Sequence, residues 1–260
     1  FRNLGRETFL VPVRWEEGWP VVSPGLGKIA RRYPLPDLPE QTWTQRPARD
    51  DFTGHQLDPA WNCLRTPRQQ FWSLTDRPGF LRLALRPQAI TRRENPSFLG
   101  RRQQHHSCLV ATRMEFAPEQ EREEAGLVCF QSDRYHYRFV RARNGTEQVL
   151  RLVKCEAGVE EILKEIKYTA GEISLQIIVD GQDYAFYYGF REDELTLCAG
   201  PVDGRLLSTD VAGGFTGVYF GLYASSNGVF SQNYADFDWF TYQEIKTKTN
   251  GAPRRLQLWT

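Results

Sequence analysis

The chain has 260 residues, of which 40% are hydrophobic and 25% charged, values that are ordinary for a globular protein. Its 33 basic and 32 acidic residues are well mixed along the chain, which argues against the clustered positive charge of a nucleic-acid-binding surface. The sequence has no run of about 18 apolar residues, so it predicts no membrane-spanning helix. We therefore expect neither a nucleic acid nor a membrane as a partner.

The first 22 residues predict a hairpin that would not be stable alone. Two apolar strands, Phe9–Trp15 and Trp19–Val22, flank the acidic turn Glu16-Glu17-Gly18. An isolated two-stranded hairpin is marginally stable in water. The only methionine is Met114, so Phe1 is not a translational start. We expect residues 1–22 to be the last piece of an N-terminal domain, and the chain to be the C-terminal part of a larger protein.

Proline then marks a connector before a long β-rich region. Five prolines lie between residues 23 and 49, a composition typical of an extended linker. From residue 50 to residue 243 short apolar or alternating segments recur, separated by turn signals such as Asn144-Gly145 and Asp203-Gly204. Residues 244–260 mix polar residues with Gly and Pro and are expected to form a tail.

The pattern between residues 50 and 243 predicts an all-β protein. About ten short strands without a long helix indicate an antiparallel sandwich or jelly roll. Glu160–Lys167 could also be read as a helix, and its neighbours favour a strand. The dipeptide Asp180-Gly181 suits a type I′ hairpin turn. The expected strands are 80–85, 108–116, 125–131, 135–143, 148–155, 160–168, 173–179, 184–190, 218–225 and 235–242.

Few residues suggest chemistry by their spacing alone. In the loop that runs from Asp210 to Gly217, three glycines surround Phe215, whose ring either points outward or begins the next strand and packs inward. Asp236 and Asp238 share one face of the last strand. They are read as a solvated strand face rather than as an acid–base pair.

The cysteines indicate neither a metal site nor a redox motif. Five cysteines, an odd number, are widely spaced and form no C-x-x-C pair, so no metal is expected in this chain. Buried free thiols are favoured over one or two disulfides. Free thiols lean toward a reducing, cytoplasmic location, and a secreted location stays open.

Six blocks, in order along the chain, resemble glycoside hydrolase family 43, the β-xylosidases and α-L-arabinofuranosidases. The resemblance implies the last strands of a five-bladed β-propeller, followed by a concanavalin-like antiparallel β-sandwich (jelly roll). It runs from about residue 3 to residue 243. The blocks are Gly5-Arg6-Glu7-Thr8 with Gly18-Trp19-Pro20-Val21; Asp50-Asp51-Phe52 with Leu57, Pro59, Trp61 and Arg65-Thr66-Pro67; Phe98 to His105; Glu124-Ala125-Gly126-Leu127; Gly213-Gly214-Phe215-Thr216-Gly217; and Ala235-Asp236-Phe237-Asp238.

The resemblance implies an inverting enzyme that releases xylose or arabinose from xylan or other pentose-containing oligosaccharides, by exo-acting or debranching cleavage. Inverting enzymes use two carboxylates roughly 6.5–9.5 Å apart, one to activate water and one to protonate the leaving oxygen. In the family these lie on earlier propeller blades, so no catalytic residue is expected in this chain. No cofactor is expected either, although a calcium ion could lie in the missing propeller.

The resemblance implies that two residues of this chain bind substrate. Arg6 matches a propeller arginine that reaches the pocket, where it would bind a sugar hydroxyl or lower the pKa of the catalytic base. The alternative for Arg6 is a structural ion pair, for example with Glu7. Phe215 matches an aromatic residue of the sandwich that leans over the propeller and walls the pocket, where its ring would pack on a pentose.

Other functions and partners remain open at this point. The sandwich could instead be a non-catalytic carbohydrate-binding module that presents Trp72, Trp239 and Phe240 as an aromatic platform, or a structural brace that mediates homo-oligomers. The N-terminal propeller part of the same enzyme is the expected partner, possibly as a separate chain.

Overall fold

A computed structural model describes residues 1–44 and 46–246 and divides the chain into two compact units. The larger unit joins residues 1–5 to the chain from Ala48 onward, and the smaller unit is residues 6–47. The last part of the predicted tail, residues 247–260, lies outside the described residues. The two units are described separately.

The smaller unit contains the predicted hairpin. Strands β1 (Val13–Glu16) and β2 (Trp19–Val22) pair antiparallel, with Val13 opposite Val22 and Glu16 opposite Trp19. Glu17 and Gly18, the two turn residues, both have positive φ angles, 49° and 84°. Such angles suit the twist of a tight hairpin. The hairpin is confirmed, although its first strand begins at Val13 rather than at Phe9.

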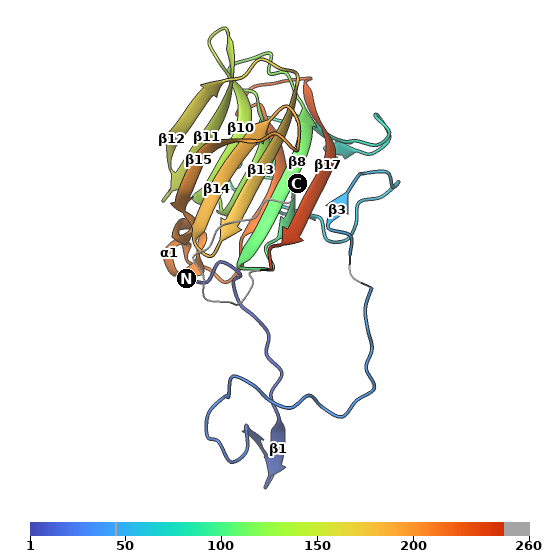
Figure 1. The fold of residues 1–260 in the computed structure, drawn as a ribbon, viewed down its shortest axis with the longest axis vertical. Helices are drawn as coiled ribbons and strands as arrows, with labels where there is room; N and C mark the ends of the chain where they lie inside the picture. Colours follow the sequence, from blue (N-terminus) through green and yellow to red (C-terminus); the bar gives the residue numbers. More distant parts are fainter. Residues whose placement is uncertain (45, 247–260) are drawn as a thin grey trace. The chain divides into compact units, whose positions relative to one another are not determined.

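The larger unit is built from two antiparallel sheets that lie face to face (Figure 1). One has seven strands in the order β12-β11-β10-β9-β16-β7-β4, and the other has eight in the order β15-β14-β13-β8-β17-β6-β5, with β3 paired to β17. The strands of the first are β4 (Asn62–Cys63), β7 (Ser97–Arg102), β9 (Glu124–Ser132), β10 (Tyr135–Asn144), β11 (Glu147–Glu156), β12 (Val159–Lys167) and β16 (Tyr219–Ser225). Those of the second are β3 (Arg49–Asp50), β5 (Trp72–Ser73), β6 (Leu81–Ala84), β8 (Ser107–Glu115), β13 (Glu172–Asp180), β14 (Asp183–Gly189), β15 (Thr196–Asp203) and β17 (Tyr234–Glu244).

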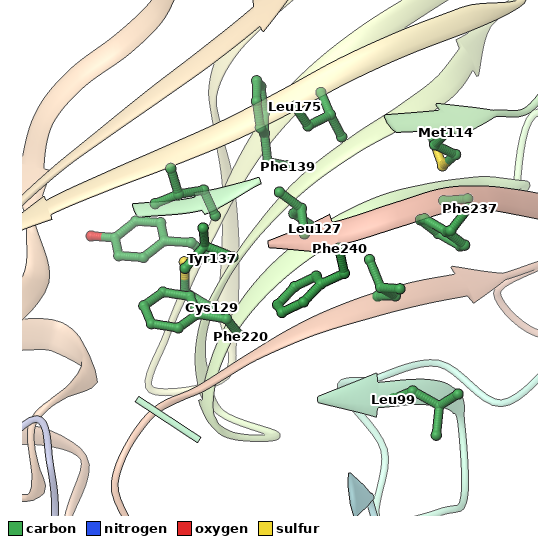
Figure 2. Packing of buried hydrophobic residues seen from close by; sticks show 14 of the residues in the cluster. Leu99, Met114, Leu127, Cys129, Tyr137, Phe139, Leu175, Phe220, Phe237 and Phe240 are labelled. Atoms are coloured by element: carbon green, nitrogen blue, oxygen red, sulfur yellow. The ribbon is translucent and has the colours of Figure 1, made fainter. Parts of the chain in front are cut away.

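Alternate residues of both sheets meet in one hydrophobic core. Strand β9 contributes Leu127 and Cys129, and β13 in the opposite sheet contributes Leu175, all fully buried. Figure 2 shows these side chains beside Tyr137, Phe139, Phe220, Phe237 and Phe240. Because successive strand residues point to opposite faces, this alternation directs one face of each sheet inward. The all-β, concanavalin A-like sandwich predicted from the sequence is confirmed.

A second, smaller apolar cluster covers the outer face of the seven-stranded sheet. It contains Phe98, Val128, Phe130, Val140 and Tyr223 from the sheet and is completed by Ile90, from the connection between β6 and β7. The amide of Ile90 donates to the hydroxyl of Tyr223 at 3.2 Å. The central strand β9 is therefore buried on both faces, which explains its nearly continuous apolar sequence.

All ten strands predicted in the β-rich region are present, including 160–168, which forms β12 rather than a helix. Two longer strands escaped prediction. The first is β7, whose sequence carries a glycine and two arginines. The second is β15, whose Pro201 argues against a central strand and is tolerated because β15 lies at the edge of its sheet.

The predicted hairpin at Gly181 is confirmed, but the type I′ turn is wrong: Gly181 has a positive φ of 64° and Gln182 does not.

Among the residues that the structure describes, helical structure is confined to the connection between β15 and β16. It consists of the 3₁₀ turn η1 (Gly204–Leu207) and the short helix α1 (Thr209–Ala212). Within the described ranges, no helix is long and apolar enough to cross a membrane.

Candidate functional site

The connection between β15 and β16 presents Phe215 to solvent. The Ser208 hydroxyl caps α1 by accepting from the amide of Val211 at 3.3 Å. Gly213 and Gly214 then both have a φ of 76°, a left-handed conformation in which glycine carries no steric penalty. These two glycines turn the chain, and the side chain of Phe215 emerges 65% exposed. We call residues 213–217 the Phe215 loop. The outward position of Phe215 is the first of the two alternatives that its spacing left open.

The Phe215 loop is held from the N-terminal side by residues 2–5, which we call the N-terminal segment. Gly5 and Thr216 form an antiparallel β-bridge. The guanidinium of Arg2 contacts the carboxylate of Asp210 on α1 at 2.6 Å, and the amide of Arg2 donates to the same carboxylate at 2.8 Å. The hydrogen bond from Arg2 lowers the pKa of Asp210 to about 2, so this carboxylate stays ionised at neutral pH.

The close approach of the N-terminal segment to the Phe215 loop requires glycine on both sides. A Cβ atom added to Gly5 would lie 2.3 Å from the amide nitrogen of Gly217. A Cβ atom added to Gly217 would lie 2.4 Å from the carbonyl oxygen of Leu4. Both separations are far inside van der Waals contact with backbone atoms. The backbones of the two segments therefore meet with no room for a side chain between them.

The sandwich supports the Phe215 loop from the other side. Gln131, near the end of β9, donates through Nε2 to the carbonyl oxygens of Gly213 and Thr216, at 3.2 Å each. A single amide therefore bridges two points of the loop and holds Phe215 between them. The exposed ring thus projects from a backbone that is fixed by the sandwich and by the N-terminal segment.

Of the two residues predicted to bind substrate, Phe215 belongs to the larger unit and Arg6 to the smaller one. The side chain of Arg6 is exposed. Arg6 directly follows Gly5 in the chain, and Phe215 directly precedes Thr216, the bridge partner of Gly5. Sequence reasoning missed Asn3, Gln131 and the pairing of Asp210 with Arg2. Nothing in the spacing of these residues indicates the contacts, because the tertiary fold brings the partners together.

The aromatic platform of the carbohydrate-binding alternative is not formed. Trp239 is 4% exposed and Phe240 is fully buried in the core. Trp72 is half-buried and packs against the same core. The guanidinium of Arg49 lies 4.3 Å from the centre of the Trp239 ring. These three rings stabilise the sandwich and offer no aligned surface to a sugar.

Asp236, which was read as part of a solvated strand face, is instead a buried ion-pair partner. Its carboxylate accepts from Nε and Nη2 of Arg82 at 2.7 and 2.8 Å and from Arg77 at 3.2 Å. Arg77 also forms a bidentate pair with Glu115. The charges line a cleft on the eight-stranded sheet and satisfy one another. This arrangement stabilises the sheet and is not an acid–base pair.

One group of side chains has the composition of a metal site. His136, Cys155 and Glu160 place their ligand atoms within 4.8 Å of one another. However, the guanidinium of Arg138 lies 3.4 Å from Nε2 of His136 and forms an ion pair with Glu160. Burial of the thiol raises the pKa of Cys155, which opposes the thiolate that a metal requires. Arg138 already supplies the positive charge that a metal ion would bring, so these residues do not fit one.

Comparison with known families supports the resemblance. A family model described as the β-xylosidase C-terminal concanavalin A-like domain matches residues 49–243. This range includes the strands of the two large sheets, except for Glu244 at the end of β17, as well as the Phe215 loop.

The chain is similar to several glycosidases over nearly its whole length. It is 39% identical to a non-reducing end α-L-arabinofuranosidase of Bacteroides ovatus, over 94% of this chain and 46% of that protein. It is 37% identical to a xylosidase/arabinosidase of Butyrivibrio fibrisolvens, over 94% and 47% of the two chains. The structure of a xylan β-1,4-xylosidase from Bacillus halodurans superposes with a TM-score of 0.86 at 30% identity, covering 93% of this chain and 48% of that one. The chain thus spans about half the length of the curated relatives it matches.

Proposed function

This chain belongs to the family of β-xylosidase C-terminal concanavalin A-like domains, and we propose that its sandwich closes the active site of a glycoside hydrolase. The enzyme would be inverting and would release xylose or arabinose from xylan or xylo-oligosaccharides by exo-acting or debranching cleavage. Two relatives that are at least 37% identical carry the names arabinofuranosidase and xylosidase/arabinosidase. The residues that distinguish xylose from arabinose would lie mostly in the propeller part of the enzyme.

The exposed ring of Phe215 is the observation on which the proposed closure of the active site rests. A phenyl ring that is 65% exposed on a fixed loop is a preformed apolar wall that loses little conformational entropy when a ligand packs on it. The C–H face of a pentose suits such a ring. By covering the sugar, the ring also excludes water from the pocket and strengthens the polar contacts inside it.

Arg6 is the second proposed substrate-binding residue. A guanidinium in the pocket donates to a sugar hydroxyl, or lowers the pKa of the carboxylate that activates water. Its place in the chain supports this role, because Arg6 and Phe215 are the chain neighbours of the bridged pair Gly5 and Thr216.

The catalytic carboxylates would come from an N-terminal propeller, with residues 1–22 as its last strands and residues 23–49 as the linker to the sandwich. The smaller unit supports this assignment, because it exposes large apolar side chains that soluble proteins normally cover. Phe9, Leu10, Trp15, Trp19 and Trp43 are each at least 70% exposed. The missing propeller blades would cover this surface.

The proposal is tested by hydrolysis of nitrophenyl β-xyloside and nitrophenyl α-arabinofuranoside. Three proteins are compared: the chain alone, the N-terminal propeller alone, and the two joined as one polypeptide. We expect the chain alone to be inactive, and the joined protein to exceed the propeller alone. Activity of the chain alone would contradict the proposal, because the catalytic carboxylates would then have to lie among its own acidic residues.

A further inference from the structure

Asn3, in the N-terminal segment, forms hydrogen bonds with both ends of the connection between β15 and β16, which contains Phe215. The side-chain amide of Asn3 donates through Nδ2 to the carbonyl oxygen of Gly204, where η1 begins, at 2.8 Å. The backbone carbonyl of Asn3 accepts from the amide of Val218, which directly precedes β16, at 2.8 Å. Asn3 is 1% exposed. Residues 204 and 218, at the two ends of the connection, are therefore held by one buried residue.

The same segment contacts the connection between those ends. The carbonyl oxygen of Arg2 accepts from the amide of Thr209 at 3.3 Å, and Arg2 pairs with Asp210. The bridge between Gly5 and Thr216 adds a contact next to Phe215 itself. The N-terminal segment therefore lies along the whole connection and touches it at its start, in its helix and in the Phe215 loop.

The chemistry of this anchor requires the amide of asparagine. Nδ2 also lies 3.3 Å from the hydroxyl of Tyr184, which in turn donates to Oε1 of Gln103 at 3.1 Å. Burial raises the pKa of Tyr184 well above its usual value, so the phenol stays protonated and donates. An aspartate at position 3 would present only acceptors to the carbonyl of Gly204. Oδ1 of Asn3 is buried and accepts no hydrogen bond from another described residue.

We infer that Asn3 is a positioning residue that sets the place of Phe215, an inference that rests on the proposed function. The segment that holds the Phe215 loop directly precedes Arg6 in the chain. The loop is thus fixed by the same stretch of backbone that leads to the second proposed substrate-binding residue. Loss of the Asn3 anchor should loosen the loop and reduce activity through Phe215.

Amide hydrogen exchange on this chain tests the physical part of the inference. In Asn3→Ala we expect the amides of Thr209 and Val218, which donate to the N-terminal segment, to exchange about tenfold faster. Asn233→Ala is the matched control, because Asn233 donates through Nδ2 to Ala117 and Glu123 in a different connection. Gly5→Ala is a second variant outside the core that should also speed exchange, because its Cβ atom would collide with Gly217.

Exchange that is unchanged in both Asn3→Ala and Gly5→Ala would overturn the inference. An equal increase in Asn233→Ala would also overturn it, because the effect would then be a general loss of stability.

A double-mutant cycle in the joined enzyme tests the link to Phe215. If Asn3 acts through Phe215, Asn3→Ala lowers kcat/KM on the arabinofuranoside or the xyloside, and it adds no further loss to Phe215→Ala. Additive losses would show that Asn3 acts elsewhere and would overturn the positioning role. If Phe215→Ala alone leaves kcat/KM unchanged, the proposed function fails. Hydrogen exchange then still decides whether Asn3 holds the loop.

Discussion

The carboxylate of Asp236 lies between the guanidinium groups of Arg82 and Arg77, and its side chain is only 4% exposed. Removing its charge would leave two partly buried guanidinium groups without a shared partner. We expect Asp236→Asn to lower the free energy of unfolding by roughly 3 kcal/mol, measured by urea denaturation. Asp193→Asn, which removes a fully exposed partner of Arg191, should have no measurable effect. Equal effects of the two substitutions would contradict the structural role of Asp236.

Phe215 and Asn3 illustrate what single residues reveal in a sequence. The glycines around Phe215 indicate a sharp turn but leave open whether the ring points outward or packs inward, and the structure shows the ring exposed. Asn3 carries no such signal, because its partners Gly204 and Val218 are some two hundred residues away in the chain. The turn was therefore predictable from local chemistry, whereas the outward position of the ring and the residue that fixes the loop were not.

Strand β10 carries the buried His136, whose ring lies close to Cys155 of β11 and Glu160 of β12. Burial, with a contribution from the charge of Arg138, lowers the pKa of His136 to about 3, against an ordinary value of 6.5. The folded protein therefore keeps His136 neutral, whereas the unfolded chain takes up a proton below pH 6.5. The stability associated with the neutral ring is present above pH 6.5 and is lost as the pH falls from 6.5 toward 3.

We expect the free energy of unfolding to fall by about 2 kcal/mol between pH 7 and pH 5 because of this histidine alone. Urea denaturation at the two pH values measures the change. His136→Gln, which cannot gain a proton, should show a correspondingly smaller fall. The same fall in both proteins would mean that another group is responsible. Burial alone would raise the pKa of Glu123, but hydrogen bonds from Ser231, Asn233 and two backbone amides lower it below 4.5, so this carboxylate changes charge only at a lower pH.

Most strands were predictable from the sequence, because alternation of apolar and polar residues indicates a strand with one buried face. Their arrangement was not. Strand β16 inserts between β9 and β7, and β17 inserts between β8 and β6. These pairings join residues roughly 90 to 155 positions apart, and no local pattern specifies them. Strand β15 was missed for a related reason, since its proline is acceptable only at the sheet edge that the fold creates.

The two units differ in how they use apolar side chains. The sandwich buries its large residues in one central core and one outer cluster, whereas residues 6–47 expose many of theirs. This contrast supports the proposal that the smaller unit completes another domain while the sandwich folds around its own core. Phe215 is one of several large apolar residues that the sandwich exposes, and its backbone is held by Gln131 and Gly5.

The most direct measurement compares kcat/KM of Phe215→Ala and Phe230→Ala in the joined enzyme. Both rings are exposed, by 65% and 76%, and they lie in the connections that precede and follow β16. They are therefore at opposite ends of a strand roughly 20 Å long. We expect Phe215→Ala to lower kcat/KM at least about tenfold, a loss of about 1.4 kcal/mol of transition-state binding, with unchanged thermal stability. Phe230→Ala should leave kcat/KM unchanged. Equal kcat/KM values for the two variants and the unmodified enzyme would contradict the closure of the active site by Phe215.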